Sequence, residues 1–133
     1  MTEASTLNEA SVAAAMDVTD RYLKALNAMD EAACEATFHF PHIRISNNQV
    51  FIQQGPGENF LERFRGYAAK DGWHHSTWDL RRPIHATDTK VHLEIHFTRW
   101  REDNTAIGTW KTIYIITQVE GRWGLQARTT FAP

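Results

Sequence analysis

The stretch from Trp73 to Leu80, WHHSTWDL, gathers residue types that could do chemistry. It supplies a base in His74 or His75, a carboxylate in Asp79 and an aromatic wall in Trp78. In a strand, His75 and Asp79 share a face but lie about 13 Å apart, so only a bulge would let them pair directly. A simpler interpretation competes with catalysis: Trp78 and Leu80 pack in the core, and Asp79 faces solvent or a dimer partner.

Seven histidines in 133 residues raise the question of a metal site. His92 and His96 have HxxxH spacing, which on a helix would bring both to one face. The residues around them alternate with a period of two, however, and four residues along a strand span about 13 Å, which is too far for one ion. No pattern of further ligands completes a site, so the sequence predicts neither a metal nor a cofactor.

Bulk composition narrows the functional classes. The formal charge is -2 and the pI about 6.4, without the basic excess or stripe that is typical of nucleic-acid binders. No apolar run is long enough for a membrane span, and no signal-peptide pattern opens the chain. The single cysteine, Cys34, cannot form an internal disulfide, which favours a reducing cytoplasm. Its alanine-rich surroundings predict a small core residue.

These residues need elements to position them, and the central one is the strand from Lys90 to Arg101. Its apolar residues fall at every second position, which predicts a strand with one buried and one polar face. Amphipathic helical patterns precede it, and long strand patterns lie on both sides of it. The expected elements are helices at 8–29, 31–37 and 56–71, a hairpin of 38–45 with 49–53, and strands at 74–86, 90–102, 106–119 and 122–131. Residues 1–7 are expected to form a flexible tail, and 1–133 a single α+β domain.

Two segments carry a family resemblance: DRYLKALNAMD at 20–30 and GRWGLQARTTFA at 121–132. With the order of elements, they resemble the nuclear transport factor 2-like superfamily, which includes the SnoaL-like proteins and ketosteroid isomerases. The resemblance implies three N-terminal helices packed on a curved, mainly antiparallel mixed sheet of about six strands. This cone-shaped α+β barrel would hold an apolar pocket, and its outer sheet face would form a dimer.

The resemblance also implies roles for individual residues. Tyr22 falls where the isomerases keep an oxyanion-hole tyrosine. Their aspartate general base corresponds to Ser46, and the region of their second oxyanion donor, 112–118, holds no acid. Because that chemistry needs a carboxylate and a neutral acid, steroid isomerisation is disfavoured. The fold supports a scaffold rather than an activity.

Candidate site residues follow from the pattern and the resemblance together. The catalytic candidates are Tyr22, His42, His75 and Asp79. The expected pocket residues are Tyr22, Phe38, Phe60, Phe64, Trp78, Phe97, Ile115, Thr129 and Phe131. Arg128 alternates with Ala127 and Thr129, so it is expected to point outward into a surface or interface ion pair. The polar strand face and an exposed tryptophan pair indicate a homodimer face, made of His92, Glu94, His96, Trp100 and Trp110.

Three functions remain open. The first is an enzyme, an isomerase, dehydratase or hydrolase, acting on an apolar small molecule by general acid/base chemistry. The second is a binding module that holds an unidentified apolar ligand in the same pocket without chemistry. The third is a protein-interaction domain that uses the sheet face. Neither nucleic acid nor a membrane is an expected partner.

Overall fold

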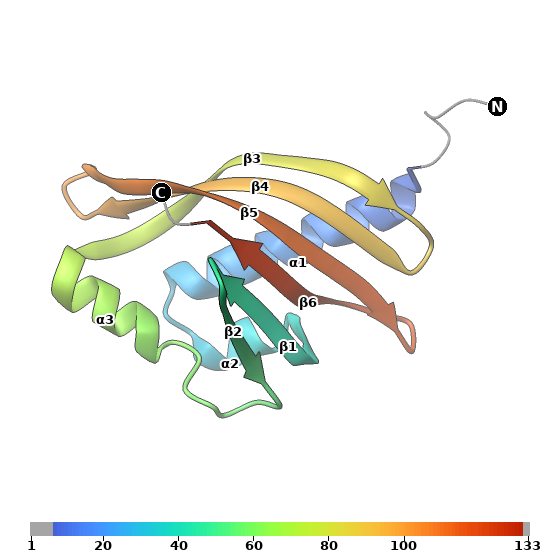
Figure 1. The fold of residues 1–133 in the computed structure, drawn as a ribbon, viewed down its shortest axis with the longest axis horizontal. Coiled ribbons are helices and arrows are strands. Elements are labelled where there is room, and N and C mark those ends of the chain that lie inside the picture. Colours follow the sequence, from blue (N-terminus) through green and yellow to red (C-terminus); the bar gives the residue numbers. More distant parts are fainter. Residues whose placement is uncertain (1–6, 132–133) are drawn as a thin grey trace.

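A computed structural model describes residues 7–131 of the chain (Figure 1). The three helices all precede the four strands at the C-terminal end of the chain. They are α1 (Glu9–Asn27), α2 (Glu31–Glu35) and α3 (Glu62–Asp71). The strands are β1 (Phe38–Ser46), β2 (Gln49–Gln53), β3 (Trp73–Ala86), β4 (Lys90–Arg101), β5 (Ala106–Val119) and β6 (Arg122–Thr130).

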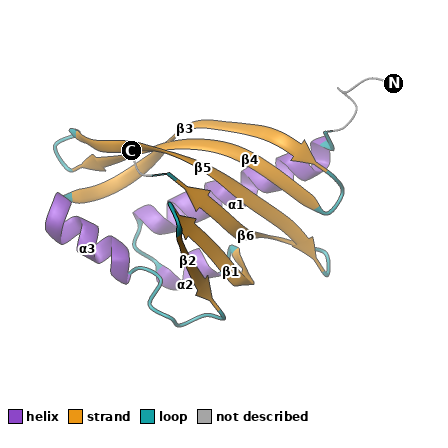
Figure 2. Cartoon of the chain, viewed as in Figure 1, coloured by secondary structure: helices purple, strands orange, loops and turns teal. Residues whose placement is uncertain are grey.

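The strands form one mixed sheet in the order β2-β1-β6-β5-β4-β3. All neighbours are antiparallel except β1 and β6, which run parallel. The sheet does not close, so β2 and β3 are its edges. It curves around α1, which packs across one face, while α3 lies near the end of that face where the strands bend away (Figures 1 and 2).

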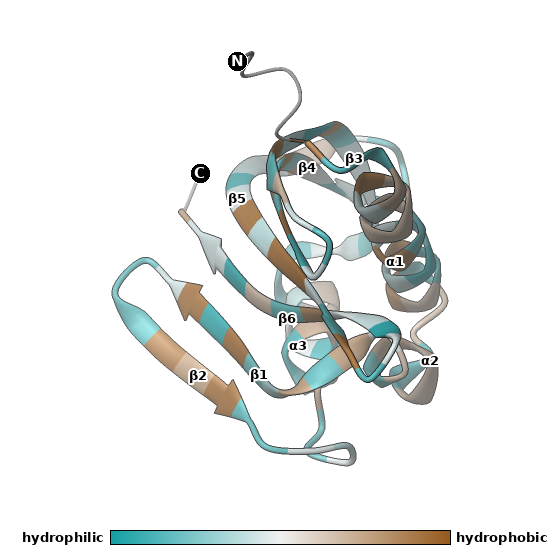
Figure 3. Cartoon of the chain, turned by 90° about the vertical axis from the view of Figure 1, so that its right-hand side faces the viewer, coloured by the Kyte–Doolittle hydropathy of each residue, from teal (hydrophilic) through white to brown (hydrophobic). Residues whose placement is uncertain are grey.

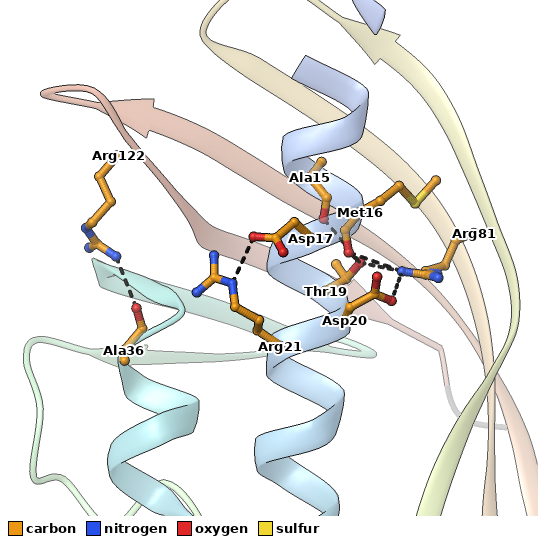
Figure 4. Close-up of polar contacts among 9 residues, drawn as sticks. All are labelled: Ala15, Met16, Asp17, Thr19, Asp20, Arg21, Ala36, Arg81 and Arg122. Atoms are coloured by element: carbon orange, nitrogen blue, oxygen red, sulfur yellow. Dashed lines mark hydrogen bonds and ion pairs between the residues drawn. The ribbon is translucent and has the colours of Figure 1, made fainter. Parts of the chain in front are cut away.

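The core lies between α1 and the concave face of the sheet. Val91, Leu93 and Ile95 of β4 are fully buried there, as the alternation along this strand predicts. A polar link joins the two layers: Arg81 of β3 reaches α1, where its Nη1 donates to Thr19 Oγ1 at 3.0 Å and to Asp20 Oδ1 at 2.7 Å (Figure 4). This contact fixes the position of the helix along the sheet.

Capping residues explain the ends of the helices. The side chains of Asn8 and Asp30 accept hydrogen bonds from backbone N–H groups in the first turns of α1 and α2, as good N-caps do. At the other end of α3, Gly72 adopts a left-handed conformation with φ 77°, which suits glycine. The loop before α3 is tied to α2, because Glu35 accepts from Gly57 N and Glu31 from Leu61 N, both at 3.0 Å.

The structure confirms the α+β fold class and the order of the elements. Two expectations are corrected. The third helix begins at Glu62 rather than at Pro56, because 54–61 is a loop held by glutamates. Of the expected tail, residues 1–6 lie outside the described part of the chain, but Leu7 forms a parallel bridge with Ala86 and packs on the core. Among the described residues, no helix is long and apolar enough to cross a membrane.

Candidate functional site

The concave face of the sheet holds a cavity in two adjoining parts. The inner part, which we call the inner chamber, measures about 100 Å³, and the outer part, the vestibule, about 590 Å³. Aromatic side chains from α1, α3 and the sheet surround the inner chamber, among them Tyr22, Phe64, Tyr67, Trp78, Phe97, Trp110 and Tyr114. The vestibule lies toward β2 and the loop before α3, where Phe51, Ile52 and Phe60 line it.

Four arginines converge on this aromatic cavity. Arg44 of β1, Arg63 of α3 and Arg128 of β6 line both parts, whereas Arg99 of β4 lines only the inner chamber. They arrive from four different elements, so the tertiary fold brings them together. Such a concentration of guanidinium groups on one cavity is the dominant electrostatic feature of the site.

Arg128 is the most buried of the four. Only 6% of its surface is exposed, and its Nη1 donates to the Tyr22 hydroxyl at 2.7 Å. Burial opposes its charge, but the tyrosine hydroxyls of Tyr22 and Tyr114 outweigh this and raise the pKa of Arg128. Its Nε and Nη2 have no hydrogen-bond partner among the described residues. The side chain is therefore a fixed cation with donors to spare.

Arg99 is held between two aromatic rings. Its Cζ lies 4.3 Å from the centroid of the Tyr67 ring and 4.3 Å from that of Trp110, distances typical of cation–π contacts. Burial lowers the pKa of Arg99. The rings fix the plane of the guanidinium, so its edge is presented to a ligand in a defined orientation.

Arg63 and Arg44 experience the repulsion of their neighbours. Burial, followed by the charges of Arg128 and Arg44, lowers the pKa of Arg63 to about 9. Burial and Arg128 likewise lower the pKa of Arg44. The two stay near apolar rings, with Arg63 Cζ 4.8 Å from the Phe64 centroid and Arg44 Cζ 4.1 Å from that of Phe51. The positive charges in the cavity thus destabilise one another.

Compensating acids are scarce around the arginines. Within residues 7–131, no Asp or Glu lines the inner chamber, and none of the four arginines lies in an ion pair. Glu58 and Glu62 line the vestibule only. A buried charge is normally paired, since removal from water is costly. A cavity with four guanidinium groups and this little compensation is suited to an anion.

His42 lies beside the arginines, in the wall of the vestibule. Its ring stacks on Phe38 with centroids 4.0 Å apart, and its Nδ1 lies 3.0 Å from the Leu125 carbonyl oxygen. Since a carbonyl only accepts, Nδ1 carries the proton, and Nε2 has no partner among the described residues. Burial and the charge of Arg128 lower the pKa of His42 to about 3. The imidazole is therefore neutral at physiological pH.

The other catalytic candidates divide between the two faces of the sheet. Tyr22 is buried against Arg128 and lines the inner chamber. His75 and Asp79 lie on the convex face, where His75 contacts Trp100 and Asp79 accepts from Thr98 Oγ1 at 2.5 Å. A register shift between Trp78 and Leu80 gives β3 a bulge at Asp79, yet it brings neither side chain to the cavity. Cys34 is fully buried, and burial raises the pKa of its thiol to about 12.

Most of the expected pocket residues lie at the cavity, and three do not. Tyr22, Phe64, Trp78, Phe97 and Phe131 line the inner chamber, and Phe60 the vestibule. Phe38 is fully buried beneath them. Ile115 and Thr129 lie on the other face of the sheet, because the register pairs Tyr114 with Arg128 and turns both of these inward.

That register also corrects two orientations. The prediction that Arg128 points outward is wrong, because Arg128, not Thr129, shares the concave face with Tyr114. Trp110 does not lie on the expected dimer face, because the register of β4 and β5 pairs it with Phe97. The two rings stack in the cavity wall with their centroids 5.6 Å apart. The strand pattern places His92, Glu94 and His96 opposite the buried face of β4. Trp100 donates to Thr77 Oγ1 at 2.9 Å.

The arginines are the functional candidates that sequence reasoning missed. One signal was available: Arg99 continues the two-residue repeat of Leu93, Ile95 and Phe97, so its position already indicates the buried face. Arg63 follows a helical spacing beside Phe64 and Tyr67. Arg128 could be found only from strand register, because one residue of slip reverses every side chain.

One further position and the question of a metal site bear on chemistry. Ser46, which stands where the isomerases have their aspartate base, lines both parts of the cavity. The position therefore faces the cavity, but it holds no carboxylate. In the described part of the chain, no group of three or more His, Cys, Asp or Glu side chains is arranged to hold a metal ion.

Solved structures with the same architecture come from several bacteria. A protein of unknown function with a cystatin-like fold from Nostoc punctiforme has a TM-score of 0.76 at 17% identity, over 96% of this chain and 94% of that one. A protein from Catenulispora acidiphila, solved in complex with S-DNPA, has a TM-score of 0.71 at 13% identity, over 93% and 94%. The protein Aln2 from a Streptomyces species has a TM-score of 0.70 at 17% identity, over 92% and 90%.

These identities support the fold alone, and no curated protein matches the chain. A family model described as NTF2-like protein (DUF6841) matches residues 11–130, which is nearly the whole described chain. The helix order, the six-stranded mixed sheet and the cavity on its concave face agree with that match. The chain therefore belongs to the NTF2-like family DUF6841.

Proposed function

We propose that the cavity binds a small organic anion with an aromatic or apolar body. The observation that carries this proposal is the convergence of Arg44, Arg63, Arg99 and Arg128 on an aromatic cavity with no acid in the described lining of its inner chamber. A guanidinium group recognises a carboxylate or phosphate through two parallel hydrogen bonds. In place of the apolar ligand expected from the sequence, we propose an acid with an apolar body.

The dimensions of the two parts support a division of the ligand. A space of about 100 Å³ is smaller than the apolar cavity of about 150 Å³ that accepts benzene, so the inner chamber holds one small group. The vestibule, at about 590 Å³, is in the range of ordinary small-molecule sites. Arg63 and Arg128 line both parts, so an acidic group placed between them would leave the body of the ligand in the vestibule.

The fold family supports a ligand-holding role in general terms. The similar structure from Catenulispora acidiphila was solved in complex with S-DNPA, so a ligand complex exists for a protein of this fold. The arginines that carry the proposal are residues of this chain's own cavity.

The proposal can be tested with naphthoate and naphthamide, which share a body and differ in charge. Isothermal titration should show naphthoate binding at least tenfold more tightly than naphthamide. Arg63→Gln should weaken naphthoate by about tenfold or more, the usual value of a hydrogen bond to a charged group. Equal affinities for the acid and the amide would overturn the proposal.

Arg65→Gln provides the matched control. Arg65 lies on the same helix, two residues away, and carries the same charge, but it is exposed and does not line the cavity. Its replacement should change naphthoate affinity less than twofold, because a solvent-exposed charge is screened. A loss equal to that of Arg63→Gln would indicate that net charge, not the cavity, attracts the acid.

A catalytic version of the same site is favoured by one contact. Arg128 donates to the Tyr22 hydroxyl at 2.7 Å, and this arrangement could stabilise negative charge that develops on a substrate oxygen. The neutral His42 in the vestibule wall, with a pKa of about 3, would accept a hydrogen bond from the substrate rather than take its proton. Tyr22→Phe separates the two functions: turnover of a substrate should fall, whereas affinity of a merely bound acid should change less than about threefold.

A further inference from the structure

The four arginines of the inner chamber fall into two groups by whether they also line the vestibule, and we call these groups the junction and the inner station. Arg44, Arg63 and Arg128 line both the inner chamber and the vestibule, so they form a junction between the two. Arg99 lines the inner chamber only and is fixed there by Tyr67 and Trp110. One acidic group at the junction would leave Arg99 unneutralised beyond it.

Among the described residues that line the inner chamber, none carries a negative charge that could compensate Arg99. The described residues that line the inner chamber include no acid, and Arg99 Nε and Arg63 Nε are buried without a hydrogen-bond partner among described residues. The vestibule, by contrast, has Glu58 and Glu62 within its wall. The excess positive charge is therefore less compensated in the inner chamber than in the vestibule.

Size and polarity limit what reaches Arg99. The inner chamber holds about 100 Å³ and is lined by Trp78, whose indole N–H is buried with no partner among the described residues. Four guanidinium groups line a space smaller than the cavity of about 150 Å³ that accepts benzene, so it suits a compact group rich in acceptor oxygens, such as a carboxylate, better than a hydrocarbon ring.

We infer that the ligand of the proposed site is a dianion with two acidic groups, one held at the junction by Arg63 and Arg128 and the other at the inner station by Arg99. The apolar body then contacts Phe60 and the β2 side chains Phe51 and Ile52, part of the apolar β2 strand in Figure 3. Aromatic dicarboxylates belong to this class. The inference rests on the proposed function and adds the second charge to it.

The test compares naphthoate with a panel of naphthalene dicarboxylates, whose isomers sample different spacings of the two acidic groups. Calorimetry on the full chain at low ionic strength should find at least one isomer that binds tenfold or more tightly than naphthoate. Arg99→Gln should reduce affinity for that isomer at least tenfold more than it reduces affinity for naphthoate. Arg63→Gln should weaken both acids.

The outcomes separate this inference from the proposed function. If naphthoate binds but no dicarboxylate binds more tightly, or if Arg99→Gln weakens both acids by one factor, the second acidic group is refuted and the proposed function stands. If neither acid binds more tightly than naphthamide, both are refuted. A thermal unfolding curve with one transition for Arg99→Gln confirms that its loss of discrimination comes from a folded protein.

Discussion

Replacing Arg63 by Gln should make the ligand-free protein more stable, although the same change weakens the binding of acids. Arg63 lies in a cavity where burial and the charges of Arg128 and Arg44 lower its pKa from 12.5 to about 9. A difference of about 3.5 in pKa corresponds to roughly 5 kcal/mol of unfavourable free energy for the charged side chain. Replacing Arg63 by Gln removes the charge and with it this unfavourable free energy.

The net gain is smaller than this upper value. The guanidinium contacts the Phe64 and Phe60 rings at 4.8 and 5.6 Å, and two such contacts contribute about 1–2 kcal/mol that Gln loses. The amide also needs hydration or a new partner. About 2 kcal/mol remains, which for a chain of 133 residues raises Tm by roughly 5 °C or more.

Differential scanning calorimetry in Tris chloride at low ionic strength measures this effect, because multivalent buffer anions would occupy the site. Arg65→Gln on the exposed side of α3 should leave Tm within about 2 °C of the wild type, as surface substitutions do. Added salt should narrow the gap between wild type and Arg63→Gln through screening. A lower Tm for Arg63→Gln would refute the idea that the arginines repel one another in the free protein.

Three other predictions concern acid stability, packing and assembly. The pKa of His42 in the folded protein is about 3, against an ordinary 6.5, so the stability that depends on a neutral His42 is fully present above pH 6.5 and is lost as the pH falls. Between pH 7.5 and 5, urea unfolding should show the wild type losing about 2 kcal/mol more stability than His42→Asn. Equal losses in the two proteins would contradict this. Gly124→Ala would place a Cβ 2.7 Å from the His39 ring and should lower the free energy of unfolding by about 1–3 kcal/mol. As a control, Gly66→Ala, in open space on α3, should raise it slightly. An unchanged stability for Gly124→Ala would show that the His39 ring moves freely. Light scattering should detect a homodimer that Ile113→Asp dissociates, since exposed Ile113 lies beside Glu94 on the convex face; a wild-type monomer at micromolar concentration would rule out this interface.

Local patterns predicted the elements well because each one depends on nearby residues. The two-residue repeat of Val91, Leu93, Ile95 and Phe97 was enough to identify β4 and its buried face. Gly72 marked the end of α3 because only a left-handed residue ends a helix in that way. The elements and the fold class could therefore be predicted from sequence.

The candidate site was harder to predict because its character depends on register between distant strands. Arg128 was assigned to the surface because it alternates with Ala127 and Thr129, which were expected to face the pocket, and only its pairing with Tyr114 shows that it points inward. His75 and Asp79 were catalytic candidates because of their residue types, yet β3 presents them to the convex face. Residue types in a short stretch indicate possible chemistry, whereas a cavity collects residues that are far apart in sequence.

The aromatic walls of the cavity also give the protein an optical property. Trp78 and Trp110 both line the inner chamber, and Trp110 lies 4.3 Å from the guanidinium carbon of Arg99. A cation against an indole ring shifts its emission, so an acid that neutralises Arg99 changes the fluorescence of Trp110 directly. The chain therefore carries an intrinsic reporter at the place where ligand charge matters most, and occupancy of the inner chamber can be followed without any label.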